Sequence, residues 1–208
     1  MKYLKKNRIS KDWLLKKNRD PFFQKAKARG FRSRSAFKLI EMNKKFKFLK
    51  NNISILDLGS SPGGWSQVIS HEVVSGKILA VDIKSMNRIN NVEFVKGDFC
   101  DSNIYEKIIL YFNNKVDVVL SDMAKNTTGN KSLDSYRTGQ LCIEAMNLSK
   151  RILSKDGVFL SKIFMGSIFK EIDDIAKKNF KKVVKYKPLS SKKESKEIYI
   201  FCKGISNI

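Results

Sequence analysis

Short apolar runs alternate with amphipathic segments along the chain from residue 53 onward. Runs rich in Ile, Val and Leu predict buried strands, and apolar residues spaced three or four positions apart predict helices. The predicted strands are 53–59, 77–83, 92–99, 116–124, 157–164, 181–188 and 197–204, and the predicted helices are 64–74, 104–112, 136–153 and 167–180. A turn at 154–157 is expected to end the helix that precedes the fifth strand.

This alternation predicts an α/β fold in which helices cover both faces of a seven-stranded, mostly parallel sheet. The last two strands are separated by about eight residues, which is too short for a crossover helix, so they are expected to pair antiparallel. Upstream of this body, residues 33–46 predict one helix and residues 10–29 one or two short helices. We expect a basic N-terminal extension over residues 1–30 and one domain over residues 31–208.

Charge is distributed unevenly along the 208 residues, whose formal net charge is +22. Residues 1–50 contain 18 Lys and Arg against 3 Asp and Glu, residues 181–208 contain 8 against 2, and the middle contains 16 against 15. Two basic ends on a neutral body predict a polyanionic partner, most often nucleic acid. A general bias toward Lys is the alternative, but it would not leave the middle balanced.

The remaining composition narrows the class of protein. No apolar run approaches the roughly 20 residues of a membrane helix, and the N-terminus has no apolar signal-peptide core. That segment is Lys-rich, whereas a mitochondrial presequence would be rich in Arg and Ser. Cys100, Cys142, Cys202 and His71 are too widely spaced to predict a metal site or a disulfide framework. We expect a cytoplasmic monomer that does not bind membranes.

Unusual residues follow the predicted strands, and this is where ligands bind in an open α/β sheet. The first strand is followed by the glycines of DLGSSPGGW, residues 57–65, which let the backbone approach a ligand closely. The second strand ends in Asp82, which suits the paired hydroxyls of a ribose. The third ends in Gly97-Asp98-Phe99, where a carboxylate and an aromatic ring suit an adenine. Together these strand ends predict an adenosine-containing ligand.

The glycine spacing separates two adenosine cofactors. A dinucleotide loop prefers G-x-G-x-x-G, which cradles a pyrophosphate. Here the spacing is G-x-x-x-G-G, with Pro62 inside and Trp65 following. That spacing suits S-adenosylmethionine better, because this cofactor has no phosphate, and an antiparallel last strand also favours a methyltransferase. A dinucleotide-dependent enzyme and a glycine-rich turn without a ligand are the weaker alternatives.

The fourth strand ends in S-D-M-A, without the Asn-Pro-Pro-Tyr-like loop of amino-group methyltransferases, and no proline precedes a cysteine. The remaining class of methyl acceptor is a hydroxyl group, which needs deprotonation and alignment.

Lys162 interrupts the apolar fifth strand, so it and Asp122 are expected to face one cleft. Burial and a second cation such as Lys38 favour the neutral amine, which can act as a base, and Glu197 is placed to hold either lysine. A lysine that merely reaches solvent is the alternative.

In the order and spacing of its motifs the chain resembles the FtsJ/RrmJ family, the large-subunit ribosomal RNA uridine 2′-O-methyltransferases. The motifs are RSRSAFKL (32–39), DLGSSPGGWSQ (57–67), GDF (97–99), SDMA (121–124), SKIF (161–164) and SKEIY (195–199), and the similarity runs from residue 13 to residue 204. The resemblance implies a Rossmann-like fold that binds S-adenosylmethionine. It also implies a uridine of the A-loop in the assembled large subunit as the target.

The resemblance further implies roles for individual residues. The catalytic set would be Lys38, Asp122, Lys162 and Glu197, with Lys162 as the proton acceptor. The cofactor contacts would be Gly63, Trp65, Asp82, Asp98 and Asp122, and the RNA contacts Arg32, Arg34, Lys38 and Tyr199. One departure is Lys125, which stands where the family often has a proline, and this loop is expected to be more mobile. An RNA-binding ribosome-assembly factor whose catalysis is dispensable is the alternative function.

Overall fold

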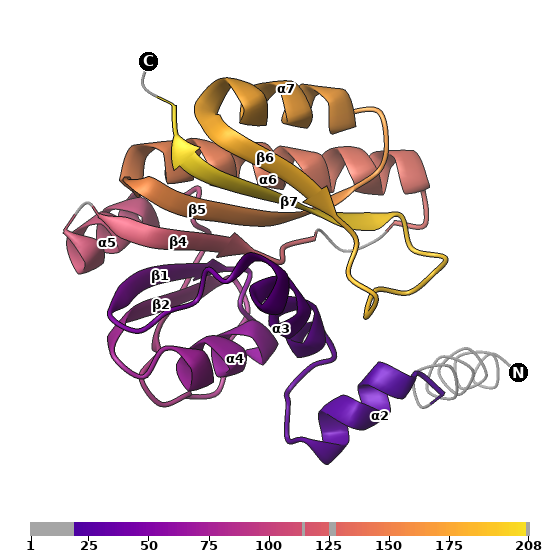
Figure 1. Ribbon diagram of the computed structural model, residues 1–208, viewed down its shortest axis with the longest axis horizontal. Helices are drawn as coiled ribbons and strands as arrows, with labels where there is room; N and C mark the ends of the chain where they lie inside the picture. The colour runs from indigo at the N-terminus through magenta and orange to yellow at the C-terminus, as the bar shows by residue number, and fades with distance from the viewer. Residues whose placement is uncertain (1–18, 114, 125–127, 207–208) are drawn as a thin grey trace, which may run out of the picture.

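The computed structural model describes residues 19–113, 115–124 and 128–206 (Figure 1). Seven strands form one sheet in the order β3-β2-β1-β4-β5-β7-β6. The strands are β1 (Ile53–Leu58), β2 (Gly76–Asp82), β3 (Glu93–Lys96), β4 (Val116–Ser121), β5 (Leu153–Phe164), β6 (Phe180–Tyr186) and β7 (Glu197–Ile205). The helices are α2 (Pro21–Ala28), α3 (Ser35–Phe46), α4 (Gly64–Glu72), α5 (Ser102–Phe112), α6 (Lys131–Ile152) and α7 (Phe169–Asn179).

The pairing of the strands confirms the predicted α/β topology. β1 runs parallel to β2 and β4, and β4 runs parallel to β5, so Asp122 directly follows β4 and Lys162 lies near the end of the neighbouring strand β5. β6 and β7 pair antiparallel as expected. The sequence did not indicate that β7 would lie between β5 and β6 and pair antiparallel with both. This insertion brings the start of β7 beside the end of β5, with Glu197 opposite Phe164.

Several predicted boundaries were wrong. The turn expected at 154–157 lies inside β5, because Val116 pairs with Leu153 whereas Val118 pairs with Val158. The extra residues of β5 form an irregularity in the ladder instead of separating a helix from a strand. α6 begins at residue 131 rather than 136, because the Asn130 side chain accepts hydrogen bonds from two backbone N–H groups of its first turn. β3 spans only four residues.

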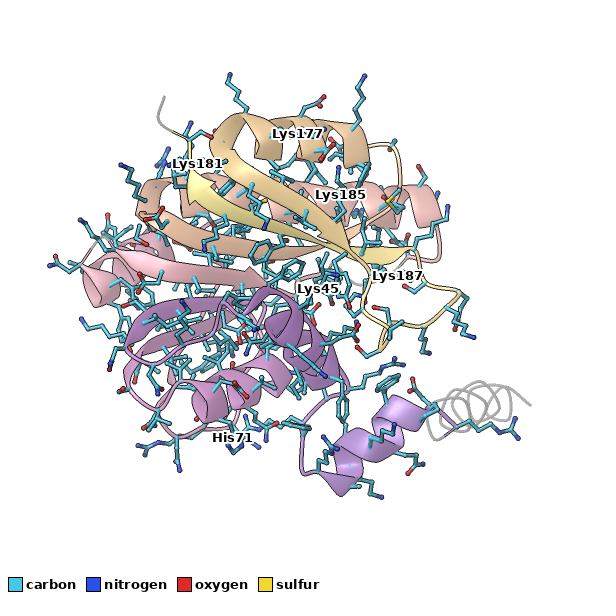
Figure 2. All side chains as sticks on the ribbon, in the orientation of Figure 1. Lys45, His71, Lys177, Lys181, Lys185 and Lys187 are labelled. Carbon is cyan, nitrogen blue, oxygen red and sulfur yellow. The ribbon has the colours of Figure 1, made fainter. Side chains whose placement is uncertain are left out.

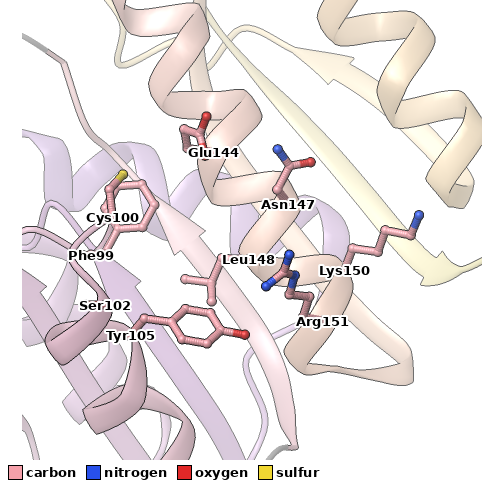
Figure 3. Close-up of a pocket in the computed structure, with 9 residues that line it drawn as sticks. All are labelled: Phe99, Cys100, Ser102, Tyr105, Glu144, Asn147, Leu148, Lys150 and Arg151. Carbon is pink, nitrogen blue, oxygen red and sulfur yellow. The ribbon is translucent and has the colours of Figure 1, made fainter.

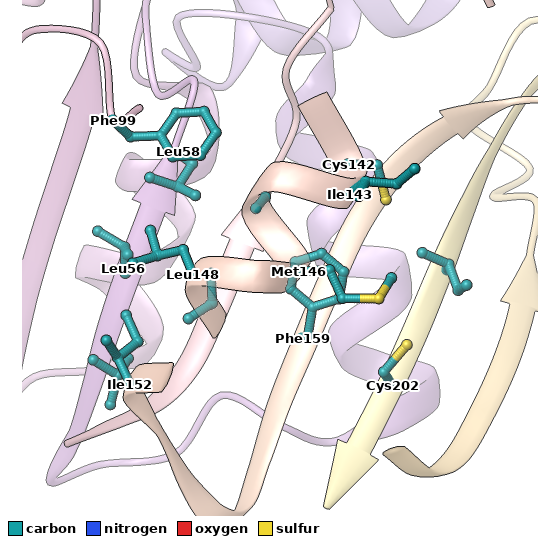
Figure 4. Packing of buried hydrophobic residues seen from close by; sticks show 14 of the residues in the cluster. Leu56, Leu58, Phe99, Cys142, Ile143, Met146, Leu148, Ile152, Phe159 and Cys202 are labelled. Atoms are coloured by element: carbon teal, nitrogen blue, oxygen red, sulfur yellow. The ribbon is translucent and has the colours of Figure 1, made fainter. Parts of the chain in front are cut away.

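Helices cover both faces of the sheet, as the alternating pattern predicted. One face packs against α5, α6 and α7 in a core that includes Leu56, Met146 and Phe159 (Figure 4). The other face packs against α3 and α4 around Leu39, Trp65 and Tyr199. Each fully buried large apolar side chain contributes about 1.5–3 kcal/mol. The second core fixes α3 and α4 against their face of the sheet.

The N-terminal part of the described chain is tied to α3. Asp20 caps α2 by accepting from two backbone N–H groups, and it also forms an ion pair with Arg34. The Phe22 and Phe37 rings lie 5.6 Å apart between their centroids. Residues 1–18, which make up much of the predicted extension, lie outside the described residues, and the boundary at residue 30 stays a prediction. Among the described residues, no helix is long and apolar enough to cross a membrane.

Candidate active site

The carboxyl ends of the parallel strands surround a cavity of about 330 Å³, within the usual size range of small-molecule sites. Its lining brings together Asp82, Asp98 and Asp122, three of the predicted cofactor residues. The other lining residues are Gly59, Ser61, Val81, Ile83, Lys84, Gly97, Phe99, Met123, Ala124 and Leu141. The convergence follows from topology, because the ends of parallel neighbouring strands meet at one edge of the sheet.

Backbone N–H groups hold the carboxylate of Asp82 at this edge. Its Oδ2 accepts from Ser61 N at 2.9 Å and its Oδ1 accepts from Lys84 N at 2.7 Å. A carboxylate has about four acceptor positions, so both oxygens keep capacity for ligand hydroxyls. Gly59 allows the loop after β1 to approach β4, because an added Cβ would overlap the Met123 side chain. Its φ of 73° also belongs to the left-handed region that glycine tolerates.

Gly63 and Trp65, two further predicted cofactor residues, do not line this cavity. Gly63 has a φ of 107° at the start of α4, and a Cβ there would lie 2.7 Å from the Arg32 guanidinium. Trp65 is buried, and its Nε1 donates to the Ser35 carbonyl at 2.9 Å. Its ring centroid lies 5.8 Å from that of Tyr199. In this structure both residues pack the start of α4 against α3 and the segment that precedes it.

Lys162 and Asp122 form an ion pair at the ends of β5 and β4. Lys162 Nζ lies 3.0 Å from Asp122 Oδ1 and donates to the Asp122 backbone oxygen at 2.6 Å. Only 8% of Lys162 is exposed, so its amine does not simply extend into solvent. Because Asp122 also lines the cavity, the amine lies one residue away from the space that a ligand would fill.

Lys38 and Glu197 form a second ion pair beside the first. Lys38 Nζ on α3 lies 2.5 Å from Glu197 Oε1 at the start of β7, and Ser191 Oγ donates to the same oxygen at 3.0 Å. Tyr199 connects the two pairs, because its hydroxyl donates to Asp122 Oδ1 at 3.0 Å and its ring centroid lies 5.8 Å from Lys38 Nζ. The structure thus brings together all four residues of the predicted catalytic set.

The resemblance implies Tyr199 as an RNA contact, which stays a prediction, but the sequence did not indicate that its side chain would be buried beside the two ion pairs. It pairs with Lys162 across β5 and β7, and it is fully buried. Burial, followed by the nearby charge of Asp122, raises the pKa of its hydroxyl well above the ordinary value. The hydroxyl therefore stays protonated and donates to Asp122. The register between β5 and β7, which no sequence pattern indicated, sets this contact.

Asp57 is a second residue that the sequence analysis did not place in the site. It is fully buried at the end of β1, where Ser66 Oγ donates to Oδ2 at 2.6 Å and Oδ1 has no partner among the described residues. Burial raises the pKa of this carboxyl to about 7, and the charges of Asp122 and Asp82 act in the same direction. The sequence did contain a signal for Asp57, because an acidic residue within a predicted buried strand is rare unless it is paired.

The two arginines that the resemblance associates with RNA are engaged within the protein. The Arg32 guanidinium donates to the carbonyls of Asn87 at 2.7 Å and Arg88 at 2.8 Å. Arg34 forms the ion pair with Asp20 and donates to the Ser190 carbonyl. Both side chains thereby order segments around the site, and their contact with RNA stays a prediction. Lys125 and Asn126 lie outside the described residues.

A larger and more open cavity of 690 Å³ lies between the start of α5 and α6 (Figure 3). Its lining includes Tyr105, Glu144, Lys150 and Arg151, of which Tyr105 and Arg151 point toward one another, and Phe99 is common to both cavities. It contains no member of the ion-pair network. The smaller cavity is therefore the candidate site. Within the described part of the chain, no three His, Cys, Asp or Glu residues gather as metal ligands would.

Comparison with known proteins bears on this site. The family model of the FtsJ-like methyltransferase matches residues 31–205. Ribosomal RNA large subunit methyltransferase E of Pelagibacter ubique (strain HTCC1062) is 54% identical over 200 residues, which cover 96% of this chain and 98% of that protein. The protein of the same name from Rickettsia akari (strain Hartford) is 42% identical, with 96% of this chain and 91% of the relative covered.

Solved structures give the same result. A Plasmodium falciparum chain described as a ribosomal RNA methyltransferase superposes with a TM-score of 0.76 at 33% identity, covering 84% of this chain and 98% of its own. Human methyltransferase-like protein 13, in complex with SAH, shares the fold with a TM-score of 0.58 at 15% identity, covering 80% and 78%. The match over most of the chain and the arrangement of the motifs around one cavity lead to one conclusion: the chain belongs to the FtsJ-like methyltransferase family.

Proposed function

We propose that this protein transfers a methyl group from S-adenosylmethionine to the ribose 2′-hydroxyl of a uridine in large-subunit ribosomal RNA, in the A-loop of the assembled subunit. The names of the relatives support the class of RNA, and the two basic ends of the chain supply the electrostatic attraction that RNA binding needs. The observation that carries the proposal is the double contact of Lys162 with Asp122 beside the cavity.

The cavity suits S-adenosylmethionine better than a dinucleotide. Its lining contains three carboxylates and one lysine, an environment that repels pyrophosphate and attracts cationic groups. Asp82 keeps acceptor positions for ribose hydroxyls, and Asp98 and Phe99 lie together for an adenine ring. When bound, the cofactor supplies a methyl group on a positively charged sulfur, which is the electrophile of the reaction.

Lys162 is positioned to act as the base. A neutral amine has two N–H donors and one lone pair. The carboxylate and the carbonyl oxygen of Asp122 accept those two donors, as the distances of 3.0 Å and 2.6 Å indicate. The lone pair is then left for the 2′-hydroxyl, whose proton Lys162 accepts as the hydroxyl oxygen attacks the methyl group. Asp122 thus orients the base at the wall of the cofactor cavity.

Lys38 and Glu197 are proposed to position the ribose. Their ion pair is mostly shielded from water, with 12% of each side chain exposed. The Tyr199 hydroxyl keeps Asp122 in the same network. Contacts of Arg32, Arg34 and Lys38 with RNA complete the proposal.

The test is transfer of labelled methyl from S-adenosylmethionine to large ribosomal subunits, followed by mapping of the modified nucleotide. We expect one 2′-O-methyluridine with the wild-type protein and none with Lys162→Ala. Methylation of a nucleobase would contradict the proposed reaction, and full activity of Lys162→Ala would contradict the role of this lysine.

A second experiment tests the alternative function. Rescue of subunit assembly in cells by an inactive Asp122→Ala protein would instead support an assembly factor, a function that the basic ends also allow.

A further inference from the structure

Glu41 on α3 anchors the loop that joins β6 to β7, residues 187–196. Its Oε1 accepts hydrogen bonds from the Tyr186 hydroxyl at 2.6 Å and from Leu189 N at 2.7 Å. Its Oε2 accepts from both the backbone N–H and the hydroxyl of Ser190, each at 3.2 Å. One carboxylate thus takes four donors from a segment nearly 150 positions away in sequence. A loop fixed in this way is unusual, because most loops keep their polar groups in water.

The charge state of Glu41 fits an anchoring role. Partial burial would raise the pKa of its carboxyl, but the hydrogen bonds from Tyr186, Leu189 and Ser190 outweigh burial and hold the pKa below its usual value. Burial and the same carboxylate raise the pKa of Tyr186 to about 12, so its hydroxyl remains a donor. The anchor is therefore charged and fully paired throughout the neutral range.

The anchored loop leads directly into the candidate active site. Ser191, next to Ser190, donates to Glu197 Oε1 at 3.0 Å, and Ser195 Oγ accepts from Glu197 N at 3.1 Å. Glu197 Oε1 is the atom that pairs with Lys38 Nζ at 2.5 Å. The contacts thus lead from Glu41 through the loop to Glu197 and back to Lys38. Both Glu41 and Lys38 belong to α3, three residues and about one helical turn apart.

Apart from Pro188, Ser190 and Ser191, which are buried, most of the loop is exposed. Leu189 is 87% exposed, and Lys192 and Lys193 are also exposed. Lys187, labelled at the base of the loop in Figure 2, donates from Nζ to the carbonyls of Lys193 and Ser195, which closes the loop on itself. The hydrogen bonds of Glu41, together with that of Arg34 to Ser190, connect the loop to α3.

We propose that Glu41 is a positioning residue for the reaction: through residues 189–191 it holds Glu197 against Lys38, and so sets the geometry of the catalytic network from outside it. This inference rests on the proposed methyl transfer. Glu41 touches neither the cavity nor the two lysines in the structure, and its effect is exerted through Ser191 and Glu197. A displacement of about 1 Å in such a network lowers a rate by as much as about a hundredfold.

The test compares Glu41→Gln with Glu106→Gln, which makes the same change of charge at an exposed position of α5. An amide keeps one acceptor oxygen but presents N–H groups to the donors on the other side, so two of the four hydrogen bonds are lost. In single-turnover methyl transfer at saturating cofactor and subunits, we expect Glu41→Gln to be slower by about tenfold or more. We expect Glu106→Gln to match wild type, and the Kd for S-adenosylmethionine to stay unchanged. Hydrogen exchange at Leu189 and Ser190 should accelerate.

A double-mutant cycle that combines Glu41→Gln with Glu197→Gln shows whether Glu41 acts through Glu197. In the Glu197→Gln background, Glu41→Gln should cause little further loss, because the group that it positions has already changed. An equal further loss would overturn the inference, and so would a Glu41→Gln protein with a lower Tm but the wild-type rate. If wild type and Glu106→Gln both fail to methylate subunits, the proposed function itself is wrong, which distinguishes the two failures.

Discussion

Replacement of Lys162 by arginine separates the basicity of this side chain from its charge. Lys162 Nζ contacts Asp122 through Oδ1 at 3.0 Å and through the backbone oxygen at 2.6 Å. Arginine keeps a cation with several N–H donors facing those two acceptors. Its guanidinium does not lose a proton in proteins, so it cannot accept one from a hydroxyl. The variant therefore keeps a cation beside Asp122 and removes the base.

The expected loss is large. General-base catalysis contributes about 10²–10⁴-fold to a rate, or about 3–5.5 kcal/mol of the barrier. Truncation to alanine would add a second effect, because it leaves the Asp122 carboxylate, 15% exposed, without its cation. Breaking a buried pair in that way costs about 3–5 kcal/mol of stability. Arginine avoids this cost, although its larger volume can lower stability by about 1–3 kcal/mol.

The assay is single-turnover transfer of labelled methyl to large ribosomal subunits, with the Tm of each protein measured in parallel. Lys185→Arg is the matched control, since Lys185 also forms an ion pair from a strand, 2.7 Å from Asp173 Oδ1, but on β6 away from the cavity. We expect wild-type activity from the control and a loss of at least about a hundredfold from Lys162→Arg. A folded Lys162→Arg protein with the wild-type rate would refute the assignment of Lys162 as the base.

Three further predictions concern the surroundings of the base. Gly59→Ala should weaken S-adenosylmethionine binding in calorimetry, because the new Cβ overlaps a methionine side chain in the cavity wall, whereas Gly30→Ala, with a similar φ and open space, should not. Tyr199→Phe should slow transfer about tenfold or more through loss of the hydrogen bond to Asp122, and unchanged RNA affinity in a filter-binding assay would separate this role from direct RNA contact. Burial raises the pKa of Asp57 to about 7, so the folded protein keeps a proton that the unfolded chain has already released, and stability falls as pH rises through this window. The difference in unfolding free energy between wild type and Asp57→Asn should therefore change by about 2 kcal/mol between about pH 5.5 and pH 8, measured by urea denaturation.

The sequence predicted the sheet and much of the site because both depend on simple regularities. Alternation of apolar runs and amphipathic segments leaves few arrangements other than a mostly parallel sheet with helices on both faces. The ends of parallel neighbouring strands meet at one edge, so Asp82, Asp98 and Asp122 were expected together before their distances were known. Lys162 was noticeable because a charge within a buried strand is costly unless it is paired.

Other parts of the site depend on contacts between distant segments, which local patterns do not encode. The place of β7 between β5 and β6 sets Tyr199 opposite Lys162 and Glu197 near Lys38. The raised pKa of Asp57 comes from complete burial, which depends on how α4 packs against β1.

The sequence by itself thus determined the fold class, the edge of the sheet that binds ligands and the residue types placed there, since these follow from periodicity and chain connectivity. Only the tertiary structure decided which charges pair, which hydroxyl joins them and how Glu41 holds the loop after β6. These outcomes depend on hydrogen-bond distances of about 3 Å between residues far apart in the chain, and a shift of one residue in strand register would abolish them.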